Sequence, residues 1–309
     1  MRERDFIQWI RSQGGINPTA VPVGPGDDCA IVRCGPEKLL VTVDQVLDGV
    51  HFNLAEHGPR AAGRKAMARN LSDVAAMASL PLGAVASVAL PRNISTEAAQ
   101  EIYHGMRSAG DVFHCPLIGG DVGVWDGALV ISVTVLGRPA GIRPILRSGA
   151  RPGDAICVTG ALGAAWRSRR HLEFLPRINE ARILASRHEI HAMIDLSDGL
   201  SRDLAHICAE SKVAGEILET EIPVHPEAEA LATPDRSGVQ AALNDGEDYE
   251  LLFTLPEDEA RQLLRDQPLP VKVTRIGTVV AGSGVTIIKP DGTRAPLEAQ
   301  GWEHKTERS

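Results

Sequence analysis

Six short segments of this chain place aspartate or glutamate residues among apolar residues and glycines. The segments are GPGDDCAIV (24–32), VTVDQ (41–45), NLSDVAAM (70–77), LIGGDV (117–122), MIDLSDGL (193–200) and NDGEDYELLF (244–253). A carboxylate flanked by Leu, Ile, Val and Ala is costly to bury unless a cation meets it. Few Lys or Arg residues lie nearby, which indicates that the cation is not part of the chain. Because Mg²⁺ is held by a few carboxylates together with substrate phosphates, the pattern predicts a Mg²⁺-nucleotide enzyme.

Composition narrows the possible partners. The 309 residues are 43% hydrophobic and 23% charged, which is typical of globular proteins. A net charge of −8 argues against a nucleic-acid or anionic-membrane partner, because phosphate backbones bind basic surfaces. It does not exclude a phosphorylated small molecule, since bound metal ions can invert the local field.

The chain also lacks the features of a membrane or disulfide-rich protein. No run approaches the roughly 18 apolar residues of a membrane span, and the amphipathic start MRERDFIQWIRSQGG has no signal-peptide core. The five cysteines include no C-x-x-C pair, so we interpret them as small buried residues of a cytoplasmic protein.

Hydrophobic periodicity predicts an α+β fold in which two mixed α/β domains occupy residues 1–138 and 139–309. In the first half we expect strands at 30–32, 39–43, 83–90, 117–118 and 128–136, with helices at 61–79 and 96–110. In the second half we expect strands at 155–159, 251–254, 274–280 and 285–288, one strand ending at Asp195, and helices at 178–188 and 200–211. A segment rich in Pro, Gly and Arg at 137–150 connects the halves.

In the first half, each candidate site residue also has a structural explanation. Asp28 follows a side-chain-poor glycine loop that could admit phosphate and metal, but an ordinary turn with solvated acids would look similar. Asp44 ends the apolar strand 39–43, where it could also start a turn. Asp73 lies in an Ala- and Met-rich helix, although its spacing from Lys65 and Arg69 would also suit an exposed helical face. His51, in a strand-like segment at 49–52, would more often be a structural histidine.

The later segments leave similar alternatives. Asp121 follows two glycines at a strand end, where a ligand could approach the backbone closely. Asp195 and Asp198 flank Ser197 immediately before a helix, so Ser197 or Asp198 could be an N-cap, a phosphate contact, or both. Glu247 lies in a glycine turn before a strand. No P-loop and no protein-kinase motif is present, and no serine or cysteine stands beside a histidine base.

The ordered motifs closely resemble the thiamine-monophosphate kinase family of the aminoimidazole-ribonucleotide-synthetase-like superfamily. The matching segments are GDDCAIV, VDQVLDGVHF, GRKAMARNLSDVAAMAS, LIGGD, LRSGARPGD, VTGALG, IDLSDGL, GEDYELLF, RIG and GWEH. They occur in the family's order and cover nearly the whole chain.

The resemblance implies ATP-dependent phosphorylation of thiamine monophosphate to thiamine diphosphate, with ATP as co-substrate and several Mg²⁺ ions. It also implies a homodimer in which the N-terminal sheets pair into a β-barrel-like interface, and a C-terminal α/β sandwich. The implied metal-binding positions are Asp28, Thr42, Val43, Asp44, Asp73, Asp121, Asp195 and Asp198, of which Asp44, Asp121 and Asp198 are expected to be catalytic. The implied nucleotide contacts are Tyr103, Gly120, Asp121, Arg147 and Ser197, and the implied thiamine phosphate contacts are His51, Glu247 and Trp302.

The chain departs from the family pattern at three places. Val43 replaces a Thr or Ser, so a metal contact there would have to use the backbone carbonyl. Val122 and Gly123 replace two threonines, and the segment 163–176 is shorter than usual. The alternatives are another ATP-using enzyme of the superfamily and a Mg²⁺-dependent phosphohydrolase that uses the same aspartates.

Overall fold

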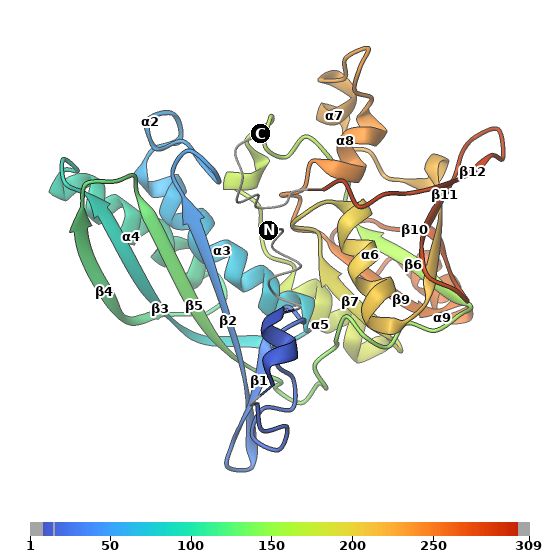
Figure 1. The fold of residues 1–309 in the computed structure, drawn as a ribbon, viewed down its shortest axis with the longest axis horizontal. Coiled ribbons are helices and arrows are strands. Elements are labelled where there is room, and N and C mark those ends of the chain that lie inside the picture. The colour runs from blue at the N-terminus through green and yellow to red at the C-terminus, as the bar shows by residue number, and fades with distance from the viewer. Residues whose placement is uncertain (1–8, 15, 302–309) are drawn as a thin grey trace.

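Two mixed sheets, one in each half of the chain, form the framework of the protein (Figure 1). The structure, a computed structural model, describes residues 9–14 and 16–301. None of the helices in this part of the chain combines the length and apolar character that a membrane crossing requires.

The N-terminal sheet has five strands, and all neighbouring pairs except β3 and β4 are antiparallel. In spatial order the strands are β1 (Ala30–Cys34), β2 (Glu37–Leu47), β5 (Val130–Arg138), β3 (Leu80–Pro91) and β4 (Leu117–Trp125). Alternate residues of β5 are buried, as expected for a sheet with one covered face. β4 is paired only with β3 among the described strands, and it is exposed along most of its length.

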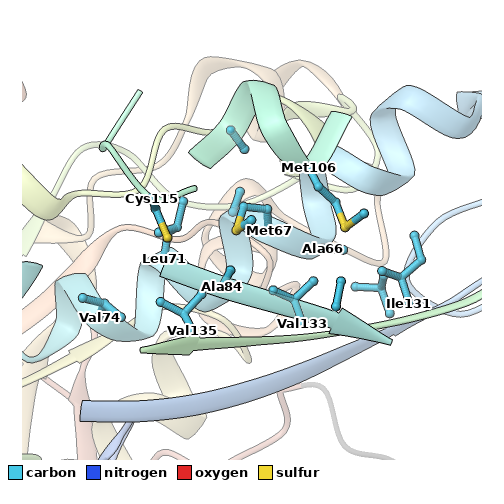
Figure 2. Packing of buried hydrophobic residues seen from close by; sticks show 14 of the residues in the cluster. Ala66, Met67, Leu71, Val74, Ala84, Met106, Cys115, Ile131, Val133 and Val135 are labelled. Atoms are coloured by element: carbon cyan, nitrogen blue, oxygen red, sulfur yellow. The ribbon is translucent and has the colours of Figure 1, made fainter. Parts of the chain in front are cut away.

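Two long helices, α3 (Pro59–Ala76) and α4 (Thr96–Asp111), cover one face of this sheet, and the short α2 (Leu54–His57) precedes them. Met67 and Leu71 of α3 belong to the same hydrophobic core as Ile131 and Val133 of β5 (Figure 2). The Oγ of Ser95 accepts a hydrogen bond from the backbone N of Ala98 at 3.1 Å, so Ser95 is the N-cap of α4.

α3 and α4 cross with their backbones in direct contact. A Cβ added to Gly105 would lie 2.0 Å from the carbonyl O of Arg60, and one added to Gly63 would lie 2.0 Å from the carbonyl O of Ile102. The two glycines therefore set how closely α3 approaches the rest of the N-terminal half.

We expect Gly105→Ala to destabilise the protein by about 2 kcal/mol, because the added methyl must separate two packed helix backbones. Denaturant unfolding measures the effect. Gln100→Ala, at an exposed position of the same helix, serves as the control and should change the free energy of unfolding very little. A Gly105→Ala protein as stable as the control would contradict the close approach.

The C-terminal sheet has seven strands and carries helices on both faces. In spatial order they are β12 (Arg294–Pro296), β11 (Gly284–Ile288), β8 (Ala214–Leu218), β10 (Val273–Val280), β6 (Asp154–Thr159), β9 (Leu251–Pro256) and β7 (Ala192–Asp195). Ile156 of β6 packs toward α6 (Leu200–Ser211), whereas Cys157 belongs to the core formed with α5 (Ile178–Arg187) and α9 (Glu257–Asp266). Because both faces are covered, every residue of β6 is buried.

Most expected elements are present, and α6 has the expected bounds. Two site residues lie at other positions in their strands than the sequence predicted. Asp44 does not end its strand, because β2 continues to Leu47, and Asp121 lies in the middle of β4 and not at a strand end. The segment 49–52 is a turn and not a strand. The helices α7 (Pro226–Ala230), α8 (Gly238–Asn244) and α9, together with β8, were not expected from the sequence.

The two halves are packed together and not only linked by residues 139–153. Leu172 and Ile178, which lie beyond β6, join the core of the N-terminal half. Arg64 of α3 donates hydrogen bonds to the carbonyl oxygens of Leu172, Glu173 and Phe174 at 2.8 to 3.0 Å. α3 thus contacts both halves, and the site lies along it.

Candidate active site

Three carboxylates from distant parts of the chain converge beside α3. Asp28 lies in the loop before β1, Asp73 in the last turns of α3, and Asp195 at the end of β7; ligand oxygens of all three lie within 4.8 Å of one another. Thr42 Oγ1, on the inner face of β2, donates to Asp73 Oδ2 at 2.5 Å, and Ser72 Oγ donates to Asp195 Oδ2 at 2.5 Å. The cluster consists of hard oxygen donors, which are the ligands that Mg²⁺ prefers.

The electrostatic state of this cluster also fits a cation site. Burial raises the pKa of Asp195 to about 7, and the neighbouring Asp28 adds to the effect. Burial, together with the charges of Asp44, Asp195 and Asp28, raises the pKa of Asp73 well above its usual value. Asp73 and Asp195 accept hydrogen bonds from the hydroxyls of Thr42 and Ser72, which do not neutralise charge. A divalent cation among these oxygens would remove both the repulsion and the desolvation cost.

Two arginines face the edges of the cluster. Arg147 forms a two-pronged ion pair with Asp28, with Nη2 to Oδ1 at 2.7 Å and Nε to Oδ2 at 3.2 Å, and its backbone N donates to Asp27 at 2.6 Å. Arg69 Nε donates to Asp44 Oδ2 at 3.0 Å, while its buried Nη1 has no hydrogen-bond partner among the described residues. Asp44 is further fixed through its backbone N, which donates to the side chain of Asn70.

The segment before α6 is held by its own helix. The carboxylate of Asp203, buried in the first turn of α6, accepts hydrogen bonds from the backbone N of Asp198 and of Gly199 at 3.1 and 3.0 Å. The carbonyl of Ser197 accepts from the backbone N of Glu247 at 2.8 Å. Neither Ser197 nor Asp198 provides a side-chain N-cap in the structure, because Gly199 occupies that position. Both side chains are partly exposed next to Asp195, in keeping with the ligand roles expected for them.

A second group of polar residues lies further toward the start of α3. Lys65 is fully buried, and its Nζ lies 2.6 Å from Glu247 Oε2, 2.6 Å from the carbonyl O of His51 and 2.7 Å from Nδ1 of His171. His51 is buried as well, and its Nδ1 accepts from the backbone N of Leu47. The structure therefore brings the expected substrate residues His51 and Glu247 together through Lys65.

A cavity of about 580 Å³ opens beside Glu247, between the segments 168–177 and 247–250. One wall is aromatic, since Phe174 and Tyr249 stack with ring centroids 3.9 Å apart and planes at 13°. Glu247 and Tyr249 both have positive φ, at +61° and +51°, which is uncommon for residues with side chains. Strained backbone of this kind is concentrated at ligand sites, where the surrounding structure maintains it.

The remaining nucleotide candidates lie elsewhere. Tyr103, Gly120 and Asp121 line a mainly apolar cavity of about 520 Å³ between α4 and the β3–β4 pair. Strand register places Asp44 opposite Val133, Val133 opposite Ala86, and Ala86 opposite Gly120. Gly120 is therefore three strand spacings, or about 14 Å, from Asp44.

Within one chain, Asp121 follows Gly120 on β4, three strands away from Asp44 on β2. Because side chains alternate along a strand, Asp121 points to the face of the sheet opposite to Gly120 and Asp44. Asp121 was expected to share metal ions with Asp44, and a single chain does not bring the two together. The same alternation turns the side chain of Val43, which is 61% exposed, away from the cluster. Trp302 lies outside the described residues.

Several residues of the site were not identified from the sequence. Lys65 and Arg69 are buried against acids, and not part of an exposed helical face. Ser72 and Tyr249 belong to segments that were recognised, but their contacts with Asp195 and Phe174 join parts of the chain that are far apart in sequence. His171 had no sequence signal, because it lies in a single 3₁₀ turn, Arg170–Leu172, which is too short to show an apolar period.

Comparisons with known proteins agree with this geometry. Residues 26–138 match the family described as AIR synthase related protein, N-terminal domain, and residues 151–289 match the corresponding C-terminal domain. A thiamine-monophosphate kinase from Rhodopirellula baltica is 38% identical over 292 residues, covering 92% of this chain and 91% of that protein. One from Bacillus subtilis is 32% identical over 329 residues, covering 98% and 99%.

The chain belongs to the thiamine-monophosphate kinase family. A solved structure described as "AaThiL complexed with AMPPCP and TMP" superimposes with a TM-score of 0.83 at 30% identity, covering 98% of this chain and 97% of that one. The family resemblance drawn from the motifs is thereby confirmed, as is the fold of two mixed α/β halves.

Proposed function

We propose that this protein transfers the γ-phosphoryl group of ATP to thiamine monophosphate and so forms thiamine diphosphate. The observation that carries the proposal is the convergence of Asp28, Asp73 and Asp195 on α3, next to a cavity with an aromatic wall and a carboxylate. Family membership supports the same reaction, since the related structure holds an ATP analogue and TMP according to its description.

We assign the carboxylates of five residues as Mg²⁺ ligands: Asp28, Asp44, Asp73, Asp195 and Asp198. Thr42 positions Asp73 by its hydrogen bond. Val43 could contribute only its backbone carbonyl to a metal ion. When bound, Mg²⁺ would neutralise the charge on the phosphate oxygens, so that the acceptor oxygen can attack the γ-phosphorus as ADP leaves. Arg147 and Ser197 lie beside these carboxylates and are assigned to the nucleotide phosphates.

The reaction needs positioning more than proton transfer. The acceptor is a phosphate oxygen, which carries no proton that must be removed near pH 8. Direct in-line transfer is therefore expected, with catalysis supplied by alignment and charge neutralisation. Trapping a stoichiometric phosphorylated protein from γ-labelled ATP would contradict direct transfer.

The thiamine group is assigned to the cavity beside Glu247. A flat pyrimidine and a cationic thiazolium suit the Phe174–Tyr249 wall and a nearby carboxylate. His51 and Trp302 are assigned to the same thiamine site because they match the family motifs.

We further propose that the chain divides near residue 138 and acts as a cytoplasmic homodimer through the N-terminal sheet. Helices cover only one face of this sheet, and the other face carries five large apolar side chains that are 39–61% exposed. They are Val43, Leu82, Val85, Ile118 and Trp125. A second copy would cover this face and the unpaired edge of β4.

The dimer would also explain the position of Asp121. Its side chain points to the uncovered face, so it can reach a carboxylate cluster only in a partner subunit. We therefore assign Tyr103, Gly120 and Asp121 to the nucleotide site of the partner.

Mixing two inactive variants tests this shared site. Asp44→Asn and Asp121→Asn should each abolish turnover, but subunit exchange between them should restore about a quarter of wild-type activity, since half of the dimers would be mixed and each would hold one intact site. The control is each variant incubated alone. No recovery, despite mixed dimers detected by native mass spectrometry, would place Asp121 in the site of its own chain.

The reaction itself is tested by incubating the protein with ATP, Mg²⁺ and thiamine monophosphate. Equal amounts of ADP and thiamine diphosphate are expected. Release of inorganic phosphate without thiamine diphosphate would favour the phosphohydrolase alternative, and the absence of any reaction would refute both.

A further inference from the structure

Lys65 has an unusual environment for a lysine. Its side chain is fully buried, and its ammonium group has three N–H donors. Three acceptors surround it: the carbonyl O of His51 at 2.6 Å, Nδ1 of His171 at 2.7 Å and Oε2 of Glu247 at 2.6 Å. Every donor of Lys65 can thus be used within the protein, which leaves none for a substrate.

The neighbours of Lys65 keep this arrangement rigid. Burial and the charge of Lys65 together lower the pKa of His171 to about 2, so the ring is neutral and Nδ1 can accept a hydrogen bond. His171 stacks on Trp166 with centroids 4.4 Å apart, and Nζ of Lys65 lies 5.2 Å from a Trp166 ring centroid. The segment that carries both rings is fixed by Arg64 of the same helix.

Glu247 is held at both its backbone and its carboxylate. Its backbone N donates a hydrogen bond to the carbonyl O of Ser197. Its Oε2 forms the ion pair with Lys65 and accepts a hydrogen bond from the hydroxyl of Tyr249 at 3.0 Å. In the described part of the chain, Oε1 has no hydrogen-bond partner. Since Glu247 lines the 580 Å³ cavity, Oε1 is the acceptor available to a ligand there.

We infer that Lys65 is a positioning residue, which holds Glu247 by Oε2 so that Oε1 is presented to an amino group or cation of a flat heterocycle in this cavity. The inference rests on the proposed function, because it takes the occupant to be the heterocyclic part of the phosphate acceptor. Lys65 acts through Glu247 and does not touch the substrate. A site that fixes an acceptor in this way also rejects analogues that lack the donor, since the carboxylate would then stay unpaired.

The test separates positioning from a purely structural role. Lys65→Met keeps an unbranched side chain, shorter by one atom, but removes the charge and the donors. We expect the apparent KM for thiamine monophosphate to rise about tenfold or more while the KM for ATP changes less than about threefold. Arg60→Met, an exposed position on the same helix, is the matched control and should leave both values unchanged.

A double-mutant cycle with Glu247→Gln tests whether Lys65 affects the KM for thiamine monophosphate through Glu247. If Lys65 acts only through Glu247, the double variant should have about the same KM for thiamine monophosphate as Glu247→Gln alone. Multiplicative effects of the two substitutions would overturn the inference, as would an unchanged KM in Lys65→Met.

Folding must be checked in the same variants. Lys65→Arg keeps the charge but cannot match three acceptors at these distances, so it should fold and still raise the KM for thiamine monophosphate. If neither Lys65→Met nor Lys65→Arg folds, the residue is purely structural and the inference is wrong. If the wild-type protein does not phosphorylate thiamine monophosphate, the proposed function fails, and this result is distinct from every outcome above.

Discussion

Asp73→Asn should reduce kcat/KM by about a thousandfold or more without destabilising the metal-free protein. Asn keeps an oxygen that can accept from Thr42 Oγ1, but it removes a buried charge that Asp44, Asp195 and Asp28 repel. We expect the melting temperature in the presence of a chelator to equal or exceed that of the wild type. The stabilisation that Mg²⁺ gives to the wild type should be largely lost.

Kinetic assays and thermal unfolding with and without Mg²⁺ measure these effects. Asp111→Asn, an exposed substitution of the same kind on α4, is the control and should change neither activity nor melting temperature appreciably. An Asp73→Asn protein with near-normal turnover would remove Asp73 from the proposed metal site.

Without metal, the protein should become less stable as the pH rises from about 4 to 7. Burial raises the pKa of Asp27 to about 6, and the pKa values of Asp195 and Asp248 to about 7. An acid whose pKa is raised on folding holds its proton more tightly in the native state. Its contribution is therefore fully present below the unfolded value near 4 and is lost as the pH passes through the folded value.

A pKa that differs by one unit between the folded and unfolded states changes the free energy of unfolding by about 1.4 kcal/mol. We expect a total decline of about 3 kcal/mol, less than the sum of the separate shifts, because interacting carboxylates do not titrate independently. Denaturant unfolding in a chelator between pH 5 and 8 measures the slope. Saturating Mg²⁺ and ATP should reverse the loss at pH 8 by stabilising the native state. Stability that rises with pH in the chelator would contradict the raised pKa values.

The sequence predicted the elements whose apolar period continues through their length. α6 and α4 bury one side and have clear boundaries, so their positions were predicted within one residue. β2 and β4 run beyond the expected strands because their exposed faces carry polar residues and glycines. Where only one face of a strand is buried, loss of the apolar run does not mark the end of the strand, and for this reason Asp44 and Asp121 were misplaced.

The candidate site was predicted in part. The motifs identified the aspartates, but they did not show which of these residues lie close together within one chain. That depends on the order of the strands and on the face of the sheet to which each side chain points. Lys65 and Arg69 could not be assigned, because a spacing of four residues from an acid also occurs on solvated helices. Their burial depends on segments more than 100 residues away that close over α3.

The four-residue spacing along α3 also means that this helix fixes the distance between the two parts of the proposed site. Lys65, Arg69 and Asp73 lie on successive turns, and the eight residues from the first to the last span about 12 Å of a rigid axis. If the two sites are assigned as proposed, the backbone hydrogen bonds of α3 fix the separation between the residues that serve them. An acceptor with one phosphate more or fewer would then present the wrong atom to the transfer site, so that the helix would select for acceptor length while the segments that fold over it would select for the heterocycle.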